Sequence, residues 1–195
     1  MESIRKNRQL FIDKEFLATL ALAKEGILDP VDKLMNKTES QEVDETGHYK
    51  GKPFPFPFIF APSGEKNREV LTSAYQGEVL DFVVEGKIKG YITVDEVFDV
   101  DKKKRIEQIF GTYDTSNPDT QLFLKRLGDV AVCGEYELLF DDIKNVKNTI
   151  LEAKEQLGAK NISALMFNAK PFHRAHERLI RITLEKCDLL VIFLL

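Results

Sequence analysis

The sequence predicts an α+β fold in which a β-rich N-terminal part is followed by the opening of a doubly wound α/β domain. Near the C-terminus, two short and continuous apolar runs, Ile162–Phe167 and residues 188–195, flank a stretch with helical spacing. Such runs are typical of parallel strands that are buried on both faces. Before residue 140 the chain instead shows short strand candidates separated by turn residues, which indicates a compact β-rich domain.

Composition and charge exclude several classes of protein. The chain has 195 residues, 43% of them hydrophobic, which allows one or two domains with a real core. The net charge of −4 argues against general binding of nucleic acid. We expect no membrane partner, because the sequence has neither a run of about 18 apolar residues nor a signal-peptide pattern. The two cysteines are compatible with a reducing compartment, so we expect a cytoplasmic protein.

The first 60 residues predict a strand, a helix, a loop and a proline-rich segment. Residues 9–12 form the strand candidate and residues 16–23 the helix. The polar stretch 36–52 reads as an exposed loop, with His48 as a loop histidine. Residues 52–60 alternate phenylalanine with proline, so we expect an edge strand or a polyproline stretch whose phenylalanines enter the core on one side.

The middle of the chain predicts a hairpin and two helices. Strands Val79–Val84 and 88–94 are joined by a turn at Gly86, and Asp101 precedes a helix whose Lys/Arg run reads as a solvated face. A longer amphipathic helix, Asp142–Leu157, ends at Gly158. We place the domain boundary there, with one domain over residues 1–158 and a second over 159–195.

Two of the three histidines lie at the start of the last predicted helix. His173 and His176 are three residues apart and therefore share a helix face, shortly after Pro171 at a strand-to-helix turn. The N-terminus of a helix favours anions. Residues 170–186 hold five Lys/Arg against two acidic residues, a local balance of +3 in a chain of net charge −4. A polyphosphate is the ligand that suits this arrangement best.

Three other interpretations remain open for this segment. A histidine pair on a helix can be half of a zinc site, although Cys133 is isolated and no third ligand is evident nearby. The pair can also be structural, and the basic residues can form an ordinary solvated face. The phosphate interpretation is favoured by position, because ligands of open α/β sheets bind at the C-terminal ends of strands.

The segment from Phe167 to His176 resembles the first active-site motif of the ATP sulfurylases (sulfate adenylyltransferases), Gln-x-Arg-Asn-Pro-x-His-x-x-His. The proline and both histidines match. Three positions differ: Phe167 stands in place of Gln, Ala169 in place of Arg, and Lys170 in place of Asn. In the family that Gln and Arg help to hold sulfate, so the differences concern the acceptor rather than the phosphates.

Other segments resemble the same family. Residues 109–114 read Ile-Phe-Gly-Thr-Tyr-Asp, close to the family's Val-Phe-Gly-Thr-x-Asp, and residues 128–135 continue the match. The resemblance implies a PUA-like barrel, then the first βαβ unit of a Rossmann-like nucleotidyltransferase domain. The chain covers only about half of the family's usual length and lacks its later Gly-Arg-Asp segment, so we expect a truncated fragment that is inactive alone.

The resemblance implies a reaction of ATP with sulfate that gives adenosine 5′-phosphosulfate and pyrophosphate. His173 and His176 are the expected catalytic residues, donating hydrogen bonds to the α- and β-phosphates. Nucleotide binding is expected from these two histidines together with Asn168 and Lys170. Contacts to the acceptor are expected from Phe167, Ala169 and Lys170. ATP would be a substrate accompanied by Mg²⁺, and we predict no metal held by the protein.

Two other functions stay open at this point. The first keeps the enzyme class but changes the acceptor, since Phe167 and Ala169 carry no charge. The second is a non-catalytic module in which the β-rich domain mediates assembly and the nucleotide site is vestigial. The expected partners are small molecules, ATP and sulfate, and the resemblance is compatible with a homo-oligomer.

Overall fold

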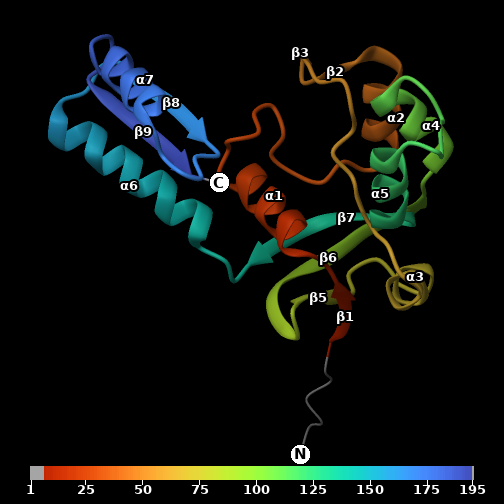
Figure 1. Cartoon of the computed structure of the whole chain (residues 1–195). Helices are drawn as coiled ribbons and strands as arrows, with labels where there is room; N and C mark the ends of the chain where they lie inside the picture. Colours follow the sequence, from red (N-terminus) through yellow and green to blue (C-terminus); the bar gives the residue numbers. More distant parts are fainter. Residues whose placement is uncertain (1–6, 195) are drawn as a thin grey trace, which may run out of the picture. The chain divides into compact units, whose positions relative to one another are not determined.

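The computed structural model describes residues 7–194, which form two compact units. The first unit ends at Asp141 and the second begins at Asp142. Among the described residues, no helix combines the length and apolar content that a membrane crossing requires. The helices and strands of each unit are labelled in chain order (Figure 1).

The first unit is built on a five-stranded sheet with the strand order β1-β5-β6-β7-β4. Its strands are β1 Arg8–Phe11, β4 Phe60–Pro62, β5 Val79–Val84, β6 Lys87–Asp99 and β7 Leu127–Leu138. β1 runs parallel to β5, whereas the other neighbours are antiparallel. The long strands β6 and β7 pair along most of their length, so the sheet follows their strong curvature (Figure 1).

The predicted hairpin is confirmed, and its turn is explained by backbone conformation. Glu85 and Gly86 both have positive φ, at 49° and 77°, the combination that a two-residue hairpin with right-handed strand twist requires. β6 continues past the predicted end at residue 94, because a register shift between Val94 and Glu96 carries the pairing with β7 on to Asp99. The sequence pattern breaks at this irregularity although the strand does not.

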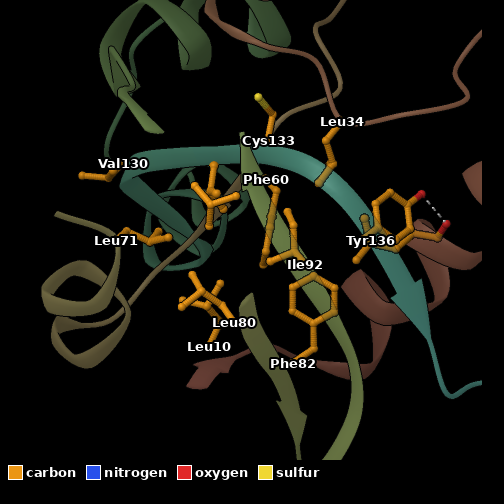
Figure 2. Packing of buried hydrophobic residues seen from close by; sticks show 13 residues of the cluster. Leu10, Leu34, Phe60, Leu71, Leu80, Phe82, Ile92, Val130, Cys133 and Tyr136 are labelled. Atoms are coloured by element: carbon orange, nitrogen blue, oxygen red, sulfur yellow. Dashed lines mark hydrogen bonds between the residues drawn. The ribbon is translucent and has the colours of Figure 1, made fainter. Parts of the chain in front are cut away.

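The core of the first unit lies between the sheet and helix α1, Lys14–Lys24. Phe60 is fully buried and meets Phe82 edge-on, with ring centroids 5.4 Å apart. Phe16 of α1 stacks on the same Phe60 at 4.5 Å. The hydroxyl of Tyr136 donates a hydrogen bond of 3.0 Å to the carbonyl of Leu20, so this buried polar group is satisfied (Figure 2).

Side-chain caps begin most helices of the first unit. The helices after α1 are α2 Lys37–Thr46, α3 Glu65–Thr72, α4 Lys102–Phe110 and α5 Pro118–Arg126. Asp13 accepts from the Phe16 N–H at 2.7 Å at the start of α1, and Asp101 caps α4 as predicted. α5, which we did not predict, begins with Asn117 as its cap and a proline in its first turn.

The expected loop over residues 36–52 is wrong. The segment holds α2, followed by two short paired strands, β2 His48–Tyr49 and β3 Lys52–Pro53. Asn36 and Glu39 form a reciprocal capping box, and Gly47 ends the helix with a φ of 65°. Val43 faces the core of this region and is buried, so a single apolar anchor holds an otherwise polar helix.

Two further expectations need correction. The phenylalanines of the Phe/Pro segment are unevenly covered: Phe54 and Phe58 are half-buried, whereas Phe56 is 37% exposed. The basic run of α4 is also not uniformly solvated. Arg105 is half-buried, donates a hydrogen bond to the carbonyl of Pro57, and has its pKa lowered by that burial.

The second unit has the predicted order of helix, strand, helix and strand. Its elements are α6 Asp142–Leu157, β8 Ile162–Phe167, α7 Arg174–Leu184 and β9 Leu189–Leu194. β8 and β9 pair in parallel, starting with Ile162 opposite Leu189. The first unit ends at Asp141, which lies before the expected domain boundary at Gly158 by the length of α6. The helix belongs to the second unit because it contacts β9. The domain limits of 1–158 and 159–195 stay a prediction.

The strands of the second unit are less covered than the apolar runs predict. Among its described residues, only Ala159 and Phe167 are buried. The side chains of Ile162 and Met166 alternate with the better covered ones along β8, and Met166 is 68% exposed. The expectation of burial on both faces is therefore not met within residues 142–194, since a two-stranded sheet leaves one face open.

Candidate functional site

The candidate site is the connection from β8 to α7. β8 ends at Phe167, and α7 begins at Arg174 with His173 as its N-cap residue in extended conformation (φ −141°, ψ 173°). Pro171 lies in the connection, two residues before the cap, so it belongs to the strand-to-helix turn that its position predicted. The two predicted strand and helix ends thus come together around the histidine pair.

Both histidine side chains accept backbone hydrogen bonds at the start of the helix. Nδ1 of His173 accepts a hydrogen bond from the backbone N–H of Ala175 at 3.3 Å. Nδ1 of His176 accepts one from the backbone N–H of His173, also at 3.3 Å. Their rings lie close together, with centroids 3.9 Å apart. The structure therefore places both predicted residues at one helix terminus, as the spacing indicated.

These hydrogen bonds define what the imidazoles can do. A neutral imidazole carries one N–H and one acceptor nitrogen. Because Nδ1 is the acceptor in both rings, the proton of each neutral ring resides on Nε2. Neither Nε2 bonds to another described residue, so the pair offers two N–H donors, suited to an oxyanion, beside the positive end of α7.

The two rings differ in their surroundings. His173 is exposed, whereas His176 is half-buried. The imidazole of His176 meets the ring of Phe167 edge-on at 5.0 Å and stacks on Phe172 at 5.4 Å. His176 is therefore held by aromatic neighbours while its partner faces solvent.

The remaining predicted site residues occupy the same connection. Asn168 and Lys170 are exposed, and within residues 7–194 neither side chain makes a hydrogen bond or an ion pair. Ala169 is half-buried and Phe167 is buried. The amide and the ammonium group are thus available to a ligand, whereas Phe167 packs inward.

Basic residues of α7 supply positive charge. Arg181 is occupied by Glu177, its partner one turn earlier, at 2.8 Å. In the part of the chain that the structure describes, Arg174 and Arg178 make no ion pair, and both are exposed. Since Arg174 directly follows the N-cap histidine, its charge adds to that of Lys170 on the approach to the two imidazoles.

The zinc interpretation gains no support from the described residues. No group of three or more His, Cys, Asp or Glu side chains among residues 7–194 could hold a metal ion. The third histidine, His48, belongs to the first unit, and its Nδ1 lies 2.7 Å from the carbonyl of Thr46, to which it donates in the neutral ring. Two imidazoles alone do not complete a tetrahedral site.

A cavity in the first unit was not predicted from the sequence. It has a volume of about 420 Å³ and lies among α1, β4 and α5, with aromatic walls and two arginines. One of them, Arg126, is already paired with Asp13 at 2.7 Å and also with Glu15. No sequence signal could have found this cavity, because its lining comes from stretches more than a hundred residues apart.

Comparison with known families divides the chain at the same point as its contacts. Residues 1–141 match a family model described as PUA-like domain, and residues 141–195 match one described as ATP-sulfurylase. The two models meet at the residue where the first compact unit ends.

Curated relatives carry one common description. A sulfate adenylyltransferase of Psychrobacter sp. (strain PRwf-1) is 30% identical over 177 residues, which are 84% of this chain and 41% of the relative. A sulfate adenylyltransferase of Chloroflexus aurantiacus (strain J-10-fl) is 24% identical over 92% of this chain and 47% of its own length. The chain thus spans less than half the length of these relatives.

A solved structure supports the fold. The structure titled "Hexameric APS kinase from Thiobacillus denitrificans" matches 93% of this chain and 33% of its own with a TM-score of 0.59. At 17% identity this likeness concerns the fold alone.

Proposed function

Because the chain belongs to the ATP-sulfurylase family, we propose that the protein transfers the adenylyl group of ATP to sulfate, which yields adenosine 5′-phosphosulfate and pyrophosphate. The observation that carries the proposal is that Nδ1 of both His173 and His176 accepts a backbone hydrogen bond at the start of α7, so that both Nε2–H groups are without a partner among the described residues. Donors of this kind suit the phosphate oxygens of a nucleotide.

In the proposed reaction a sulfate oxygen attacks the α-phosphorus of ATP. The bond from that phosphorus to the oxygen bridging the α- and β-phosphates breaks, and pyrophosphate leaves with the bonding electron pair. No covalent intermediate with the enzyme forms. Catalysis then depends on positioning and on donors aimed at the developing charge. The Nε2–H groups of His173 and His176 are the proposed donors to the α- and β-phosphates.

Other residues of the connection would complete the nucleotide site. Asn168 and Lys170 are exposed and uncommitted among the described residues, so both can contact the nucleotide phosphates. We propose that Mg²⁺ enters with the nucleotide, because it prefers carboxylate and phosphate oxygens with several retained waters. The exposed Arg174 and Arg178 would raise the local concentration of the anionic substrates.

A second candidate function is adenylylation of a different acceptor. Phe167 and Ala169 stand where the family carries the Gln and Arg that help to hold sulfate, and neither can pair with an oxyanion. Lys170 is then the charged residue of the connection that could replace them. A less charged or larger nucleophile would suit this site.

The chain spans 41% of the Psychrobacter relative, so we propose that a complete site also needs residues from the part of the relatives that this chain does not match. We propose that the 195-residue chain alone shows no measurable turnover. Residues 7–194 leave both Cys133 and Cys187 free, which fits our proposal of a reducing, cytoplasmic setting. A homo-oligomer is proposed as the assembled form.

The phosphate role is tested by ATP binding to the intact protein, by which we mean the full-length protein of which the 195-residue chain is proposed to be a part. We expect His173→Ala and His176→Ala each to weaken ATP binding about 10-fold or more, since a hydrogen bond to a charged group contributes about 1.5–3 kcal/mol. His48→Ala is the matched control, because among residues 7–194 the ring of that histidine bonds only to the nearby Thr46 carbonyl. Unchanged ATP affinity in both variants would instead favour a non-catalytic assembly module.

The acceptor is tested separately by pyrophosphate release. The intact protein is supplied with ATP and either sulfate, molybdate or no oxyanion. Release that depends on sulfate or molybdate supports sulfate as the acceptor. If neither oxyanion stimulates release while ATP binding still requires the histidines, the acceptor is a different nucleophile. Turnover by the 195-residue chain alone would contradict its proposed incompleteness.

A further inference from the structure

Phe167 is the residue of the motif whose placement the proposed reaction leaves unexplained. It is the last residue of β8 and only 6% exposed, although most residues around it are open to solvent. Its ring meets the imidazole of His176 edge-on, with centroids 5.0 Å apart and planes inclined by 63°. A side chain so covered contacts its protein neighbours rather than a ligand.

Besides the His173 ring, the same imidazole has a second phenylalanine as its neighbour. Phe172, in the connection, stacks on His176 at 5.4 Å with planes inclined by 28°. Phe172 also meets Phe167 edge-on at 6.4 Å. The two phenylalanines and His176 thus form a three-ring cluster, which we call the aromatic support, in which each ring touches the other two.

The aromatic support acts on a ring whose hydrogen bonding is already defined. Nδ1 of His176 accepts from the His173 N–H at 3.3 Å, a long hydrogen bond that alone would orient an imidazole weakly. Edge-on and stacked contacts are favourable ring geometries and oppose rotation of the side chain. Together they keep Nδ1 toward the helix backbone and leave the proton on Nε2.

We propose that Phe167 and Phe172 are positioning residues that hold His176 in the Nε2–H tautomer and present that donor to a nucleotide phosphate. This inference rests on the proposed phosphate role of His176. It also gives residue 167 a different task from the Gln at the corresponding place in the family motif. Position 167 would serve the phosphate side through His176, and recognition of the acceptor would fall to other residues.

The tautomer can be observed without any ligand. In the ¹⁵N-labelled 195-residue chain, the ring nitrogens of the three histidines report which one carries the proton. We expect His176 to show a protonated Nε2 and an unprotonated Nδ1. His48 is an internal reference, because its Nδ1 lies 2.7 Å from the Thr46 carbonyl and should carry the proton.

Substitutions then separate positioning from simple packing. Phe167→Leu keeps an apolar side chain but removes the ring, and Phe167→Tyr restores a ring. We expect Phe167→Leu to average the two nitrogen signals of His176 and, in the intact protein, to weaken ATP binding about 10-fold. Phe167→Tyr should keep two distinct nitrogen signals and an ATP affinity close to that of the wild type. Met166→Ala is the matched control, since this neighbouring side chain is 68% exposed.

The acceptor alternative is tested by Phe167→Gln, which introduces the family residue. If residue 167 positions His176, this variant weakens ATP binding and leaves the KM for sulfate no lower. A lower KM for sulfate with unchanged His176 signals would overturn the proposal and assign the position to the acceptor. Unchanged signals and ATP affinity in folded Phe167→Leu would overturn it as well.

Failure of the proposed function has a different signature. If the His176 signals depend on Phe167 but do not respond to ATP in the intact protein, the aromatic support exists and the phosphate role is wrong. If they respond to ATP but are insensitive to Phe167 and Phe172 substitutions, the phosphate role stands and the positioning proposal is refuted.

Discussion

Thirteen buried residues of the first unit form one cluster between its sheet and its helices, whereas among residues 142–194 of the second unit only Ala159 and Phe167 are buried. Phe60 and Phe82 lie in this cluster (Figure 2), and both side chains are fully buried. In the second unit, the candidate site is held by two long hydrogen bonds and one group of aromatic contacts.

The contrast shows that packing and chemistry are distributed unevenly along this chain. Each fully buried apolar side chain contributes about 1.5–3 kcal/mol to folding, so the first unit has many independent sources of stability. The second unit holds its histidines by fewer contacts than the first core has, and neither Nε2 atom bonds to another described residue. Substitutions should therefore affect stability in the first unit and ligand binding in the second.

The strongest test of this comparison is a large-to-small change in the first core. Phe82→Ala should lower the free energy of unfolding of the first unit by about 3–5 kcal/mol, because it leaves a cavity beside Phe60. All five tyrosines lie before residue 142 and the chain has no tryptophan, so tyrosine fluorescence during urea unfolding reports this unit alone.

Phe193→Ala in the second unit is the matched control, since Phe193 is 44% exposed. It should leave the urea midpoint of the tyrosine signal unchanged. A shift as large as that of Phe82→Ala would mean that the two units unfold as one and that the contrast in burial has no energetic counterpart.

Each unit contains one cysteine, so the reactivity of the two thiols compares the units directly. Cys133 is 4% exposed, and burial raises the pKa of its thiol to about 11 from an ordinary value of 9.0, whereas Cys187 is half-buried. Since the thiolate is the reactive form, we expect a thiol reagent at pH 8 to modify Cys133 about 100-fold or more slowly than Cys187.

Mass spectrometry of the labelled chain, with peptides assigned after digestion, measures both rates. Cys187→Ser should remove the fast phase, and unfolding in urea should make the remaining thiol reactive. Equal rates in the folded chain would show that the first core opens as readily as the second unit.

A smaller effect concerns the buried hydroxyl of Tyr136. Phe at this position removes its hydrogen bond to the Leu20 carbonyl, so Tyr136→Phe should lower the free energy of unfolding by about 1 kcal/mol. Burial also raises the pKa of Tyr136 from 10.0 to about 12. A raised folded pKa gives stability that is complete below pH 10 and is lost as the pH rises toward 12.

The pH dependence is measured as the urea midpoint between pH 8 and pH 12 in both proteins. We expect the wild-type midpoint to fall more steeply above pH 10 than that of Tyr136→Phe. Tyr75→Phe is the control, because Tyr75 is 64% exposed. Identical slopes for wild type and Tyr136→Phe would contradict the assigned burial effect.

Much of the second unit could be predicted from the sequence. The two apolar runs appear as β8 and β9, which pair in parallel. The helix predicted between them appears as α7. These elements are indicated by local periodicity and a helix terminus. The prediction was wrong for α2. Its capping residues Asn36 and Glu39 are visible in the sequence, but the polar composition of the segment indicated a loop.

The site itself was predicted only in part. The spacing of His173 and His176 indicated one shared helix face, and the structure brings the rings within 3.9 Å. The spacing did not indicate that His173 is the N-cap of α7, that each Nδ1 accepts a backbone hydrogen bond, or that Phe167 packs against His176. These relations depend on where the chain turns between β8 and α7, which no local periodicity encodes.

The sequence by itself determined the order of strand, helix and strand, the family resemblance and the residues that gather at one helix terminus. Those features follow from periodicity and short motifs, which act over a few neighbouring residues. Only the tertiary structure decided which ring nitrogens are occupied, which motif residue is buried and how the first core closes. Such features depend on contacts between segments far apart in the chain or across a turn, and their geometry exists only after the backbone has folded.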